Sequence, residues 1–125
     1  MAQGMLMARH DDDGVAVDLE RLADEIRDEA RTAPAGRAAR NLLPGPGAAL
    51  TQSVMGLAAG RQLAEHDNPG VATLQVLRGR VAIRAGDEEV ELEAGQWAPI
   101  PAGRHSVHSH ADAAMLLTVA ATAAR

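Results

Sequence analysis

The sequence predicts an all-β domain with a single helix near its N-terminus. Several short runs of alternating or β-branched residues lie between residues 50 and 119, and Gly, Pro, Asn and Asp separate them. Only the segment that follows Asp18 has apolar residues at helical spacing. Short strands at close intervals with turns between them are typical of a β-sandwich or β-barrel.

Length and composition favour one small core. The chain has 125 residues, which suffices for one domain, and 46% of them are hydrophobic. There is no Phe or Tyr and a single Trp, so Val, Leu, Ile, Met and Ala must fill the interior. Because small side chains fill less volume, an internal cavity or a buried dimer face is favoured. An alanine-rich β-domain has few large side chains to stabilise it alone, and sheet edges benefit from pairing, so we expect a homodimer.

Charge and cysteine content exclude several classes of function. The net charge is −5 and no basic patch of the kind that binds phosphates is present, so we expect no nucleic-acid partner. The absence of cysteine excludes disulfides, thiolate metal ligands and a cysteine nucleophile. No apolar stretch approaches membrane-spanning length and the first residues lack a signal-peptide pattern, so we expect a cytoplasmic protein without a membrane partner.

The N-terminal part divides into a tail and a helix. Residues 1–14 have no periodicity and are predicted to form a disordered tail. Residues 15–36 are predicted to hold an amphipathic helix, which Asp18 caps and which ends near Thr32, ahead of Pro34. Its apolar side, expected to lie against the barrel wall, consists of Leu19, Leu22, Ala23, Ile26 and Ala30.

Residues 37–125 are predicted to form the β-domain. The segments 80–85 and 88–92 flank Gly86-Asp87 and are expected to form a hairpin. Alternation points Val81 and Ile83 inward and leaves the neighbouring arginines in water. The expected strands cover residues 37–43, 50–57, 71–77, 80–85, 88–92, 97–100, 106–110 and 113–119.

Two glycine-anchored blocks point to a family. The first contains Gly60, His66 and Gly79, and the second runs from Gly95 through Pro101-Ala102-Gly103-Arg104-His105. These blocks resemble the two motifs of the cupin superfamily, and the segments 72–79, 111–112 and 116–119 resemble small stand-alone cupins. The resemblance implies a double-stranded β-helix, or jelly-roll barrel, with one N-terminal helix. Such proteins are typically dimers, and most have no known function.

The family's metal-ligand positions are only partly kept. In the first motif, His66 takes the place of the first histidine, Asn68 that of the second and Ala72 that of the glutamate. In the second motif, Ser106 stands at the histidine position and His105 lies one residue early. The resemblance therefore implies a degenerate site for divalent Fe, Mn, Ni or Zn, with His66 and His105 as its ligands. Two imidazoles bind such ions weakly unless a further donor is added, for which Glu65, Gln52 and Gln75 are candidates.

A ligand other than a metal is the alternative occupant of this site. The two imidazoles can serve as acid and base or bind a carboxylate or hydroxyl group. Arg104 is a candidate partner for an anion, and Trp97 a candidate for stacking on a ligand or a partner subunit, although packing is its commoner role. The predicted ligand-binding residues are His66, His105, Asn68, Gln75, Arg104 and Trp97.

Two further histidines lie near the second motif. On an extended strand His108 and His110 face one side and His105 the other, so all three converge only if the strand has a bulge. We therefore interpret His108 and His110 as exposed strand residues.

Three hypotheses about function follow. The first is a barrel that binds a small molecule as a sensor, carrier or accessory protein. The second is a metal-dependent enzyme of the dioxygenase or isomerase type. The third is a structural module in which the acidic helix of residues 18–30 recognises a partner.

Overall fold

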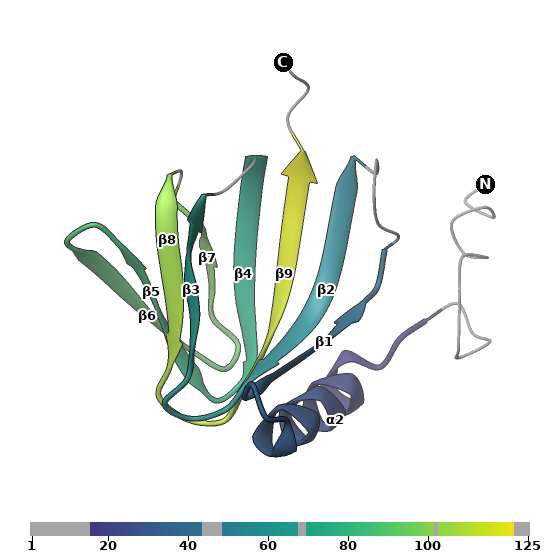
Figure 1. Cartoon of the computed structure of the whole chain (residues 1–125). Coiled ribbons are helices and arrows are strands. Elements are labelled where there is room, and N and C mark those ends of the chain that lie inside the picture. The colour runs from purple at the N-terminus through teal and green to yellow at the C-terminus, as the bar shows by residue number, and fades with distance from the viewer. Residues whose placement is uncertain (1–15, 44–48, 68–69, 102, 122–125) are drawn as a thin grey trace, which may run out of the picture.

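The computed structural model describes residues 16–43, 49–67, 70–101 and 103–121 (Figure 1). At residues 65–67, 70 and 121 it describes the backbone alone. The predicted tail of residues 1–14 and the candidate ligand Asn68 lie outside the described residues. Within these ranges, no helix combines the length and the apolar character needed to cross a membrane.

Helix α2 (Leu19–Thr32) forms where the sequence predicts it. The Asp18 carboxylate accepts hydrogen bonds from the backbone N–H groups of Glu20 and Arg21, at 3.1 and 3.2 Å. These bonds satisfy two of the amides that a helix start leaves without partners. The helix ends at Thr32, and the buried residues on its apolar side are Leu22, Ala23, Ile26 and Ala30. The predicted helix and its N-cap are therefore confirmed.

The described residues form nine strands in two antiparallel sheets, which confirms the predicted all-β barrel with an N-terminal helix. The five-stranded sheet has the order β1-β2-β9-β4-β7 and the four-stranded sheet the order β3-β8-β5-β6. The bounds are β1 (Arg37–Asn41), β2 (Leu50–Leu57), β3 (Gln62–Asp67), β4 (Gly70–Arg78), β5 (Arg80–Ala85), β6 (Glu88–Glu93), β7 (Trp97–Pro99), β8 (Arg104–Ser109) and β9 (Ala113–Ala121).

Strand β3 was not predicted from the sequence. Its segment contains no β-branched and no aromatic residue, so it lacks the composition by which strands are recognised. The hairpin of β5 and β6 was predicted correctly, because Ala85 pairs with Glu88 across a two-residue turn in which Gly86 has a φ of 61°. Val81 and Ile83 on this hairpin are buried.

The main core lies between the two sheets. We call the face of each sheet that points to the other sheet its inner face, and the opposite one its outer face. On β4 the buried residues Ala72, Leu74 and Val76 alternate with less buried ones, so they mark the inner face. The cluster consists of Leu57, Ala72, Leu74, Val76, Val81, Ile83, Leu92, Ile100, Val107, Ala113 and Met115.

Helix α2 packs on the outer face of the five-stranded sheet, beside β1 and β2 (Figure 1). Leu22 and Ile26 form a second buried cluster there with Val54. Each helix acid that follows the cap lies within 4 Å of an arginine. The pairs are Glu20 and Asp24 with Arg78, Glu25 with Arg21, Asp28 with Arg31, and Glu29 with Arg40. The acidic side that the third hypothesis requires is therefore largely neutralised.

Candidate functional site

His105 is the one buried imidazole among the described residues, with 3% of its surface exposed. It lies on β8 at an inner-face position, two residues before the core residue Val107. Its Nδ1 atom is 3.2 Å from the carbonyl oxygen of Gly103. Because a carbonyl oxygen can only accept, this contact makes Nδ1 the protonated nitrogen, and the lone pair of the neutral ring lies on Nε2.

A register shift in β3 brings the position of His66 opposite His105. Leu63 pairs with Val107 and His66 with His105, so β3 has one more residue than β8 between these pairs. Without this bulge, Glu65 would stand opposite His105. The side chain of His66 is outside the described part of the chain. Its backbone position, however, is a direct cross-strand neighbour of the buried imidazole.

The other family ligand positions that the structure describes, Ala72 and Ser106, offer no donor to this site. Ala72 is 4% exposed and packs in the core, and Ser106 on the outer face is hydrogen-bonded to His108 Nε2 at 2.9 Å. Gln52 bonds the Thr118 hydroxyl at 3.0 Å, and these two are partners at outer-face positions. Since divalent transition metals take at least three protein ligands in such sites, the residues described on the inner face do not fit the expected metal.

The structure does not bring Gln75 and Trp97 to His105, and Arg104, its neighbour in the chain, is at an outer-face position of β8. Gln75 lies between the inner-face residues Leu74 and Val76, so alternation assigns it to the outer face. Trp97 is its cross-strand partner on β7 and is 57% exposed. Arg104 is exposed at the start of β8. Gln75 and Trp97 therefore do not line the interior beside the buried imidazole.

An open pocket lies where the edges of the two sheets meet. It has a volume of about 380 Å³ and is lined by Arg37, Ala38, Ala39, Met55 and Leu63, from β1, β2 and β3. Leu63 is opposite Val107, and His105 is the next inner-face residue along β8. This pocket could not be predicted from the sequence, because neither β3 nor the pairing of β1 with β2 was predicted.

His108 and His110 point to the outer face, as alternation predicts. Burial, and after it the Arg84 guanidinium and His110, lowers the pKa of His108, while Glu89 acts in the opposite direction. Both histidines were interpreted from the sequence as exposed strand residues, and Glu89 and Glu91, which alternate outward on the predicted hairpin, were not identified as their neighbours. The missing information was the strand order β8-β5-β6, which brings this hairpin next to the histidines.

No family model matches the chain, and neither does any curated protein. Solved structures do match it. A conserved protein of unknown function from Streptococcus pyogenes is 27% identical with a TM-score of 0.64, over 70% of this chain and 76% of that chain. A cupin superfamily protein from Desulfitobacterium hafniense is 18% identical with a TM-score of 0.64, over 69% of this chain and 78% of that chain.

A larger enzyme contains a similar unit. Salicylate 1,2-dioxygenase from Pseudaminobacter salicylatoxidans is 21% identical with a TM-score of 0.63, over 78% of this chain and 32% of that chain. These likenesses agree with the two facing antiparallel sheets. The chain therefore has the fold of a small cupin-type domain.

Proposed function

We propose that this domain binds a small organic molecule in the pocket between β1, β2 and β3. The observation that supports this proposal is the pocket itself, whose volume of about 380 Å³ suits a small ligand. Four of its five lining residues are apolar and the fifth, Arg37, is cationic. This lining favours a ligand with an aliphatic body and a carboxylate, because a guanidinium pairs well with a carboxylate. Such a protein would act as a sensor, carrier or accessory protein.

A pocket-filling variant tests this proposal. Ala39 is exposed on the edge strand β1, so Ala39→Trp fills the pocket without disturbing the main core. Ala94→Trp makes the same change at an exposed turn and serves as the control. We expect C4 to C8 monocarboxylates to shift pocket-residue NMR resonances in the wild type and the control, and Ala39→Trp to bind at least about tenfold more weakly. Equal binding by both variants would refute the pocket as the site.

A metal-dependent enzyme of the dioxygenase or isomerase type is the second candidate. The likeness to a dioxygenase favours it, whereas the apolar Ala72 and the outward Ser106 count against it. Elemental analysis of freshly purified protein separates the two candidates. Stoichiometric Fe, Mn, Ni or Zn that is lost in both His66→Ala and His105→Ala would favour the enzyme.

We further propose that the domain is a homodimer. Ala120 on β9 is the cross-strand partner of Leu50 on β2 and of Val71 on β4. These three apolar side chains therefore form a row on the outer face of the five-stranded sheet. Leu50 is 42% exposed, Val71 64% and Trp97 on the same face 57%. Light scattering at micromolar concentration should give a dimer mass that Val71→Glu reduces to that of a monomer, and a monomeric wild type would contradict the proposal.

The cytoplasmic location of the protein stays a prediction.

A further inference from the structure

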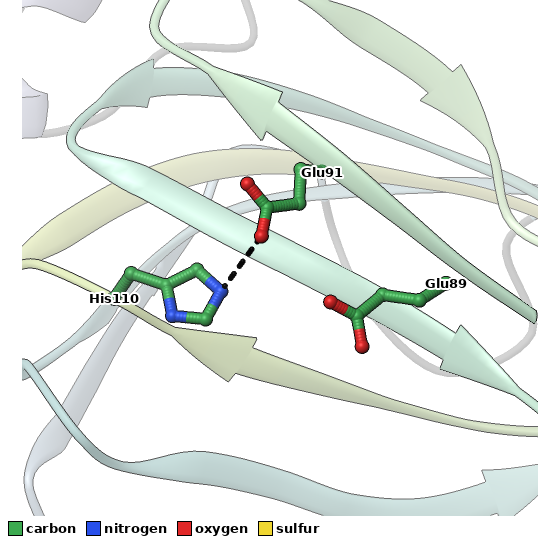
Figure 2. A group of neighbouring side chains, drawn as sticks. All are labelled: Glu89, Glu91 and His110. Atoms are coloured by element: carbon green, nitrogen blue, oxygen red, sulfur yellow. Dashed lines mark ion pairs between the residues drawn. The ribbon is translucent and has the colours of Figure 1, made fainter.

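A mixed group of imidazole and carboxylate side chains lies on the outer face of the four-stranded sheet. Glu89 and Glu91 come from β6, and His110 directly follows β8. One ligand atom from each residue lies within 4.8 Å of the other two, and Figure 2 shows that all three side chains point toward a common space. His110 Nε2 is 3.4 Å from a carboxylate oxygen of Glu91.

The fold explains why residues from β6 and from the end of β8 meet here. Strand β5 runs between β8 and β6, and its central outer-face residue is Ala82. The cross-strand partners of Ala82 are His108 and Glu91. Its methyl group is too short to separate side chains that reach over it from both neighbouring strands. Ala82 is fully buried although it faces outward, so the surrounding side chains cover it.

We propose that Glu89, Glu91 and His110 bind one divalent first-row transition-metal ion, such as Zn²⁺, outside the barrel. One imidazole nitrogen and two carboxylate oxygens form a donor set that such ions accept. The side chains of Glu91 and His110 are 51% and 31% exposed, so an ion can enter from solvent and water can complete its coordination. The ligands come from paired strands, so their backbones are already held in place.

Arg84 competes with the ion for one ligand. Its Nε atom is 2.8 Å from a Glu89 carboxylate oxygen, and both side chains are partly exposed. Metal binding therefore has to break this ion pair, and it brings a divalent cation close to the positively charged guanidinium. It follows that Arg84→Gln strengthens metal binding, whereas loss of any of the three ligands weakens it.

Calorimetric titration of the full-length chain with Zn²⁺, after removal of bound metal by a chelator, tests this site. We expect His110→Gln and Glu91→Gln to weaken binding at least about tenfold, since the loss of an outer-shell partner alone costs 10- to 100-fold. Arg84→Gln should strengthen it several-fold. The control is Glu88→Gln, which removes the same charge from β6 at an exposed position of opposite alternation and should leave the affinity unchanged.

A paramagnetic probe then places the ion. Substoichiometric Mn²⁺ should broaden the NMR signals of the Glu91 and His110 amides before that of the His105 amide. Broadening centred on His105, affinity unchanged in both ligand variants, or a wild type that binds no Zn²⁺ would each overturn the proposal. All the substituted side chains are at least partly exposed, so the variants should fold, and their circular dichroism spectra would check this.

Discussion

The outer faces of the two sheets follow the same alternation but have opposite character. On the five-stranded sheet, Val54 and Leu116 are apolar outer-face residues, and α2 packs against them. On the four-stranded sheet, the outer face carries imidazole, carboxylate and guanidinium groups, and no described element covers it. The residue types at the outward-facing positions of the strands therefore decide whether a sheet face packs against a helix or exposes polar groups to solvent.

Truncation of a fully buried side chain of α2 should have the greatest effect. Ile26 is fully buried between α2 and β2, so Ile26→Ala leaves a cavity in the second cluster. We expect a loss of about 2–5 kcal/mol in the free energy of unfolding. Urea denaturation would measure it, with Val17→Ala, which truncates a more exposed residue, as the control. A loss equal to that of the control would mean that α2 does not stabilise the sheet.

Gly56 tests how closely the helix approaches the covered face. A Cβ atom at this position of β2 would lie 2.5 Å from the Ile26 backbone oxygen and 2.9 Å from its Cγ2 atom. We therefore expect Gly56→Ala to lower the free energy of unfolding by about 1–3 kcal/mol, because α2 has to shift away from β2.

Gly60→Ala separates this steric cost from a conformational one. Gly60 has a φ of 80°, but a Cβ there would meet no atom within 4 Å. We expect Gly60→Ala to lower the free energy of unfolding by about 1 kcal/mol, from backbone strain alone. If the loss in thermal stability were larger for Gly60→Ala than for Gly56→Ala, the close packing of α2 on β2 would be refuted.

Arg78 links the helix to the sheet through polar contacts. Its guanidinium donates to Asp24 at 2.9 Å and to the backbone oxygens of Leu77 and Glu20 at 2.7 and 3.3 Å. The side chain is 28% exposed, so solvent screens part of this energy. We expect Arg78→Met to lower the free energy of unfolding by about 1–2 kcal/mol. Arg80→Met, two residues along the chain, should have little effect, and equal losses would refute the link.

Much of the covered region could be predicted from local sequence. Asp18, the helical spacing of Leu22 and Ile26, and Pro34 each act within a few residues, so the position of α2 follows from nearest neighbours along the chain. The hairpin around Gly86-Asp87 is equally local. The glycine-anchored blocks supplied the fold class, because their spacing reflects turns that the barrel requires.

The sites were harder to predict because they depend on contacts between distant segments. The bulge that brings the position of His66 opposite His105 cannot be recognised from the residue types around it, and β3 itself lacks strand-forming residues. The meeting of Glu91 with His110 requires β5 to lie between their strands. Gln75 and Trp97 were assigned to the ligand site from residue type, whereas alternation on β4 places them outside.

The smallest expected effect concerns the polar outer face. Burial and the Arg84 guanidinium lower the pKa of His108 below its ordinary value of 6.5. As the pH falls below about 6.5, the unfolded chain therefore binds this proton before the folded one does, and the free energy of unfolding decreases until the folded pKa is passed. Urea denaturation with EDTA between pH 7.5 and 4.5 should show His108→Gln losing less stability than the wild type. Parallel pH profiles would show that this face imposes no such cost, so the two outer faces would not differ in their response to acid.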